Sequence, residues 1–96
     1  MLKKNYSKTG GVCRATFKLP ADVGANVAAI AGEFNDWTPE PMKKLKDGSF
    51  SATVSLAAER PYRFRYLLDG ERWENDWAAD DYLPNVFGTD DSVIVC

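Results

Sequence analysis

The sequence predicts an all-β fold, an immunoglobulin-like antiparallel β-sandwich of about seven short strands. Three observations lead to this class. Apolar and polar side chains alternate with a period of two in several runs, which indicates strands with one buried face. Turn residues interrupt these runs about every 8–12 residues. No window shows the periodicity of an amphipathic helix.

The first strong strand signal is the alternating run from Val12 to Leu19, which ends at Pro20. Residues 1–10 are polar and rich in lysine, so we expect a flexible N-terminal segment before a single domain over residues 11–96. Residues 27–31 form a short and nearly continuous apolar run, which is typical of a buried strand.

The middle of the chain contains a loop, a short strand and a hairpin. Residues 32–41 hold two prolines and an Asn-Asp pair, which predict a loop. Residues 42–45 fit a short edge strand. Asp47-Gly48 is a hairpin signal, and residues 50–56 alternate between apolar and polar side chains.

Residues 60–77 predict a second hairpin, closed by the Asp69-Gly70 turn. One face of its first arm is apolar and contains Tyr62, Phe64, Tyr66 and Leu68. The candidate binding residues of this hairpin are Arg63, Arg65, Trp73 and Trp77. A long acidic loop follows over residues 75–89, and residues 92–96 fit a closing strand. We expect the acids of residues 71–91 to be solvated.

Composition excludes several function classes. The net charge of −2 argues against nucleic acid as a partner, because phosphate binding requires a basic surface. No apolar run is long enough for a membrane helix, and no signal peptide is recognisable, so we expect a cytoplasmic protein without a membrane partner. The chain lacks histidine and a paired-carboxylate pattern, so we expect no enzyme activity, no metal and no cofactor.

The two cysteines leave one alternative open. A disulfide between Cys13 and Cys96 is geometrically possible if their strands are neighbours. We expect free thiols, because stable disulfides are rare in the cytosol.

Four segments carry a resemblance to a known family. They are Gly32-Glu-Phe-Asn-Asp-Trp37, the run from Tyr62 to Gly70, Trp73, and the closing residues 88–95. In this order and spacing they resemble the family 48 carbohydrate-binding modules. This family includes the glycogen-binding domain of the AMP-activated protein kinase β subunit and the N-terminal early-set domains of isoamylases. The resemblance extends over nearly the whole chain.

The resemblance implies a stand-alone, non-catalytic module that binds an α-glucan such as glycogen, starch or a maltooligosaccharide. Trp37 and Trp73 match the two tryptophans that stack on glucose rings. Arg65 and Asp91 fall where binding members carry a lysine and an asparagine that bond sugar hydroxyls, and Phe87 falls at a leucine beside the glucan. The possible supporting residues are Arg63 and Trp77.

An alternative function stays open at this point. The chain could be a protein-interaction or regulatory early-set domain that keeps the fold without binding sugar, with a glycogen-metabolising enzyme or a regulatory protein as partner. Sugar binding predicts that Trp37 and Trp73 are exposed on one surface. The alternative predicts a buried or rotated Trp73 and an exposed apolar patch or edge strand.

Overall fold

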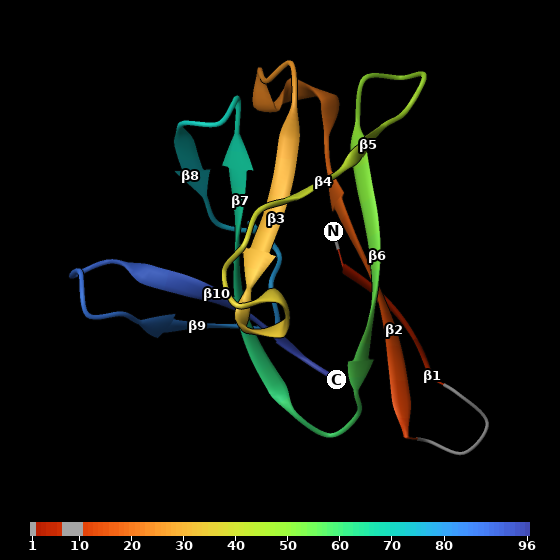
Figure 1. Ribbon diagram of the computed structural model, residues 1–96, viewed down its shortest axis with the longest axis vertical. Coiled ribbons are helices and arrows are strands. Elements are labelled where there is room, and N and C mark those ends of the chain that lie inside the picture. Colours follow the sequence, from red (N-terminus) through yellow and green to blue (C-terminus); the bar gives the residue numbers. More distant parts are fainter. Residues whose placement is uncertain (1, 7–10) are drawn as a thin grey trace.

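Two antiparallel sheets face each other in the computed structural model, which describes residues 2–6 and 11–96 (Figure 1). The first sheet has the strand order β1 (Leu2–Tyr6), β2 (Val12–Leu19), β6 (Phe50–Ala57) and β5 (Lys43–Lys44). The second has the order β4 (Glu40–Pro41), β3 (Ala28–Gly32), β7 (Pro61–Leu68), β10 (Asp90–Val95) and β9 (Asp81–Pro84). Strand β8 (Arg72–Glu74) pairs with β7 at the side of the second sheet. The only helical turns among the described residues are the short 3₁₀ turns η1 (Ala21–Val23) and η2 (Glu33–Asn35).

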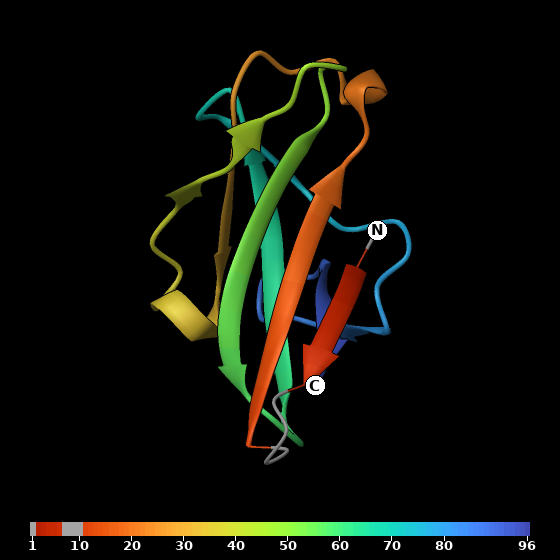
Figure 2. The ribbon, with the colours of Figure 1, turned by 90° about the vertical axis from the view of Figure 1, so that its right-hand side faces the viewer.

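The structure confirms the all-β, immunoglobulin-like sandwich. Figure 2 shows the first sheet in front of the second, with β6 and β2 crossing over β7. The described residues form ten strands, against about seven expected from the sequence. The additional strands are β1, β9 and β4, and β4 lies within residues 32–41, which were expected to form a loop. Between β4 and β5 the chain passes from the second sheet to the first at the buried Met42, whose backbone N–H donates to Ala28 O at 2.8 Å.

The N-terminal segment differs from its prediction. Leu2–Tyr6 pairs antiparallel with β2, from Leu2 opposite Phe17 to Tyr6 opposite Cys13, so five residues of the segment expected to be flexible form a regular strand. A polar strand can form here because it only has to add backbone hydrogen bonds to a sheet edge that β2 provides. Residues 1 and 7–10 lie outside the described residues.

The core is filled by the inward faces of β2 and β7. On β2 the alternation places Cys13, Ala15, Phe17 and Leu19 inward, and all four are buried. On β7 the buried set is Tyr62, Phe64, Tyr66 and Leu68, as predicted. Phe17 and Phe64 meet edge to face with ring centroids 4.9 Å apart, a favoured aromatic geometry that joins the two sheets. The opposite face of β7 is therefore free to carry polar side chains.

The predicted Asp69-Gly70 turn is confirmed and is anchored to a neighbouring strand. Both residues have positive φ angles, 53° and 72°, which aspartate tolerates and glycine adopts without steric cost. The Asp69 carboxylate accepts the backbone N–H groups of Asn26 and Val27 at 2.8 and 3.1 Å. These bonds hold the pKa of Asp69 below its usual value. The turn thus fixes the β7–β8 hairpin to the start of β3.

Cys13 and Cys96 are free thiols, and both are buried in the core. Burial raises the pKa of the Cys96 thiol, and a hydrogen bond with Cys13 raises it further. The Cys96 thiol is therefore expected to be a poor nucleophile at neutral pH.

Candidate functional site

A groove of about 980 Å³ lies on the outer face of the second sheet. Its lining includes all five residues that the sequence singled out for sugar contact, together with one of the two supporting residues. These residues are Trp37, Arg63, Arg65, Trp73, Phe87 and Asp91. They come from four separate segments: the turn after η2, strand β7, strand β8 and the β9–β10 hairpin. The fold therefore brings these predicted residues to one surface.

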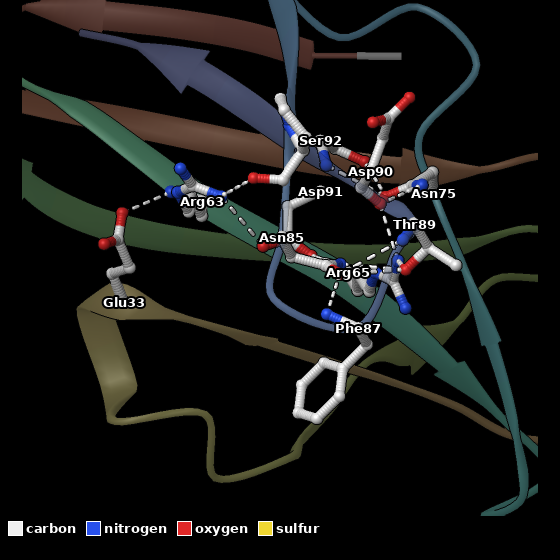
Figure 3. Close-up of polar contacts among 11 residues, drawn as sticks. Glu33, Arg63, Arg65, Asn75, Asn85, Phe87, Thr89, Asp90, Asp91 and Ser92 are labelled. Carbon is white, nitrogen blue, oxygen red and sulfur yellow. Dashed lines mark hydrogen bonds and ion pairs between the residues drawn. The ribbon is translucent and has the colours of Figure 1, made fainter.

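Trp37 is held at the groove by a strained turn. Its side chain is 38% exposed, and its φ of 58° lies in the left-handed region, which is unusual for a bulky residue. The Trp37 N–H donates to Gly32 O at 2.9 Å, and Asn35 Oδ1 accepts the Gly32 N–H at the same distance. Glu33 Oε1 accepts the backbone N–H of Arg63 at 2.6 Å, which ties η2 to β7 (Figure 3). Such strain persists only where the surroundings enforce it.

Trp73 reaches the groove from strand β8. It pairs with Leu67, on the face of β7 that also carries Arg63 and Arg65. Its side chain is 44% exposed. Trp73 is therefore neither buried in the core nor turned away from Trp37.

The floor of the groove contains two arginines around one carboxylate (Figure 3). Arg63 Nη1 lies 3.4 Å from Asp91 Oδ2 and donates to Pro84 O at 3.0 Å. Arg65 Nε lies 3.1 Å from Asp91 Oδ1, an ion pair without the geometry of a hydrogen bond. Arg65 Nη2 donates to Thr89 Oγ1 and to the carbonyl of Asp90 at 2.7 and 2.6 Å. Asp91 is only 7% exposed, so its carboxylate contacts both guanidinium groups from the buried side of the groove.

One wall of the groove is the tip of the β9–β10 hairpin, which Asn85 organises. Asn85 Oδ1 accepts the N–H groups of Phe87 and Thr89 at 2.9 and 3.3 Å. Asn85 Nδ2 donates to Thr89 Oγ1 and Asp91 Oδ1 at 2.9 and 3.1 Å. This fixed turn displays Val86 and Phe87, whose side chains are 93% and 86% exposed. Rigid display of two apolar side chains is typical of a contact surface.

Sequence reasoning missed four groove residues, namely Pro84, Asn85, Val86 and Thr89. The available signal was Asn85 three residues before Gly88, since asparagine caps tight turns with its own side chain. Residues 75–89 were expected to form one long loop, but they contain strand β9. Because β9 pairs with β10, residues 85–89 form the tip of a hairpin rather than part of a loop.

The acidic stretch is not uniformly solvated, which corrects a second prediction. Asp76 is fully buried, and its carboxylate accepts the Tyr66 hydroxyl at 2.6 Å and the Ala78 N–H at 2.8 Å. Burial raises the pKa of Tyr66 above its usual value, and the negative charge of Asp76 adds to the shift. The hydrogen bonds of Asp76 therefore anchor the segment between β8 and β9 to strand β7.

Trp77 lies outside the groove. Its side chain is 64% exposed and lines a smaller hollow of about 190 Å³ instead. Trp77, one of the two supporting residues named from the sequence, therefore does not line the groove.

No group of three or more metal-ligating side chains occurs among residues 2–6 and 11–96. No helix in the described part of the chain is long and apolar enough to cross a membrane. A scan against protein-family models and a search of curated proteins both find no match for this chain. The resemblance to family 48 modules stays a prediction from the motif residues, and the function has to be argued from the geometry of the groove.

Proposed function

We propose that the protein is a non-catalytic α-glucan-binding module that takes a glycogen, starch or maltooligosaccharide chain in the groove. The observation that carries the proposal is the placement of Trp37 and Trp73. Both are partly exposed, at 38% and 44%, and both line the same groove. A pair of fixed aromatic faces beside hydrogen-bonding groups is what a chain of glucose rings requires.

The groove offers the two kinds of contact that sugars need. The C–H face of a glucose ring packs on an indole, and the edge of the ring presents hydroxyls. Arg63 and Arg65 remain 32% and 20% exposed and can donate to those hydroxyls. In this arrangement Asp91 orients the arginines rather than serving as the main sugar ligand, because its carboxylate is already engaged. Phe87 adds an apolar edge at the hairpin tip.

The expected affinity is modest. A shallow site with two stacked rings contributes about 4–7 kcal/mol, which corresponds to a dissociation constant between about 1 mM and 10 µM. Calorimetric titration with β-cyclodextrin measures this directly, since the closed ring presents glucose faces without chain ends. Binding in that range is the expected result for the unmodified protein.

Three variants make the test specific. Trp37→Ala and Trp73→Ala should each weaken β-cyclodextrin binding at least about ten-fold, since each removes one stacking face. Trp77→Ala is the matched control, because it removes an exposed indole that does not line the groove. Its affinity for β-cyclodextrin should stay within two-fold of the unmodified protein. A folded protein that releases no heat with millimolar β-cyclodextrin would refute the proposal.

The second candidate function is a protein-interaction or regulatory module. One observation favours it: Val86 and Phe87 project from a rigid hairpin tip beside the exposed edge strand β9. A glycogen-metabolising enzyme or a regulatory protein in the cytoplasm is the partner that this reading implies. Titration with β-cyclodextrin separates the two functions. Sugar binding predicts a measurable affinity that Phe87→Ala reduces in part, whereas pure protein docking predicts no affinity in the unmodified protein.

A further inference from the structure

A second hollow of about 190 Å³ lies on the other side of strand β8 from the groove. Trp73 and Glu74 are neighbours on β8, so their side chains point to opposite faces, and Trp73 lines the groove whereas Glu74 lines this hollow. Its apolar lining comes from Leu19 and Leu68 at one end of the sandwich. We call it the Trp77 hollow after its most exposed aromatic side chain.

The Trp77 ring is presented by a rigid turn. Asp76, the preceding residue, is fully buried and accepts the Ala78 N–H at 2.8 Å, so its side chain spans the turn that carries Trp77. The Asp76 N–H donates to Ser92 Oγ at 2.8 Å, which fixes the turn to β10. The indole itself is 64% exposed. A large aromatic side chain that is fixed at its base and open to solvent costs little ordering entropy when it binds a ligand.

Hydrogen-bond donors and acceptors line the hollow together with the indole. Arg72 Nη2 donates to Val23 O at 2.8 Å, and Arg72 Nε lies 3.6 Å from Glu74 Oε1, which orients the guanidinium at the hollow. Asp22 and Glu74 supply carboxylates at the lining. The hollow therefore combines one stacking face, a donor fork and two acceptors. Its charged groups sum to a slightly negative surface, which disfavours an anionic ligand.

We propose that the Trp77 hollow is a second sugar subsite that binds a single glucose unit at the end of an α-glucan chain. The class of ligand rests on the function proposed above for the groove. The volume of about 190 Å³ is below the ~300–1,000 Å³ of pockets for drug-sized ligands, so it suits one ring rather than a chain. A cation over the indole is the competing occupant, but among the described residues Trp77 is the one aromatic side chain of the lining, so no aromatic cage encloses a cation there.

This second site makes the module bivalent. The groove and the Trp77 hollow lie on opposite sides of β8, so one short linear chain does not fill both. A branched glucan presents many chain ends close to one another, and a second weak contact then acts at a high effective concentration. The module should therefore hold a branched polymer more tightly than the groove affinity alone predicts, and Trp77→Ala should remove that gain.

Two-dimensional NMR of the tryptophan indole N–H groups tests the inference, because each of the three tryptophans gives its own signal. Maltotriose is titrated into the unmodified protein, and then into protein whose groove is saturated with β-cyclodextrin. The expected result is a saturable shift of the Trp77 signal in both titrations, with an affinity at least about ten-fold weaker than that of the groove, since only one ring stacks. Trp37→Ala provides the same test with the groove disabled.

The outcomes separate this inference from the groove proposal. If the Trp37 and Trp73 signals shift and that of Trp77 does not, the second subsite is refuted and the groove stands. If the Trp77 shift disappears when β-cyclodextrin fills the groove, the two tryptophan sites are not independent and the inference also fails. If tetramethylammonium chloride shifts Trp77 and maltotriose does not, the hollow is a cation site and the sugar assignment is wrong. A saturable shift of Trp77 alone supports the subsite and refutes the groove.

Discussion

Replacing Tyr66 by phenylalanine tests the buried hydrogen bond between Tyr66 and Asp76, which anchors the segment between β8 and β9. The Tyr66 ring is fully buried, and its hydroxyl donates to Asp76 Oδ2 at 2.6 Å. Tyr66→Phe removes one oxygen atom and leaves the Asp76 carboxylate buried with one fewer donor. A hydrogen bond to a charged group contributes about 1.5–3 kcal/mol net, and leaving such a group unsatisfied falls at the upper end of that range. We expect a loss of about 2–3 kcal/mol in the free energy of unfolding.

Urea denaturation at pH 7 measures this loss. With an m value of about 1–1.5 kcal/mol/M, as expected for a domain of this size, the urea midpoint should fall by about 1.3–3 M. Tyr62→Phe is the matched control, because its hydroxyl donates to the uncharged carbonyl of Ala57 at 3.0 Å. That variant should lose only about 0.5–1.5 kcal/mol. Equal losses for the two variants, or a loss below about 0.5 kcal/mol for Tyr66→Phe, would show that the buried carboxylate does not depend on the hydroxyl.

The pH dependence provides an independent check on the same residue. The pKa of Tyr66 is raised in the folded protein, first by burial and then by the charge of Asp76. The stability linked to its proton is therefore complete below the unfolded pKa of about 10 and decreases as the pH rises above it. The unmodified protein should lose stability above about pH 10 more steeply than Tyr66→Phe, which has no proton to release at this position.

Two further predictions concern backbone geometry and acid stability. Gly32→Ala should destabilise the protein by more than about 2 kcal/mol in a thermal melt, because the new Cβ would lie 2.5 Å from the backbone oxygen of Arg63. Gly24→Ala, whose Cβ meets nothing within 4 Å but whose φ is +73°, should cost only about 1 kcal/mol. The lowered pKa of Asp69 provides stability above about pH 4 that is lost as the pH falls through the folded pKa. Asp69→Asn should therefore show a smaller drop in thermal midpoint between pH 6 and pH 2, and an unchanged drop would contradict the linkage.

The sequence predicted those parts of the fold that depend on local patterns. The period of two on β2 and β7 correctly separated inward aromatics from outward arginines, because alternation follows directly from strand geometry. The Asp69-Gly70 turn was confirmed for an equally local reason. Strand β9 was missed because its four residues are all exposed, so no buried face produces an alternating pattern.

The candidate site was predictable only in part, because its geometry is tertiary. The placement of Trp37 beside Trp73 requires β3 to pair with β7, which no single segment reveals. The burial of Asp76 depends on the Tyr66 hydroxyl, which donates to its carboxylate, and on Ser92 Oγ, which accepts its backbone N–H. Both partners lie on strands distant in the sequence, so the acidic stretch looked solvated. Asn85 was missed because its hydrogen-bond partners Thr89 and Asp91 lie close to it only when the β9–β10 hairpin has formed.

The pairing pattern of the two sheets has a consequence for how the protein folds. In both sheets the central partners come from opposite halves of the chain: β2 pairs with β6, and β3 pairs with β7. Closing such distant contacts costs loop entropy before any pairing energy is recovered, so we expect folding in milliseconds to seconds rather than microseconds. In the chain Trp37 lies between the paired strands, after β3 and before β7, and Trp73 follows β7. Because Trp37 and Trp73 reach one surface only when β3 pairs with β7, we expect the groove to be absent until this long-range pairing has formed.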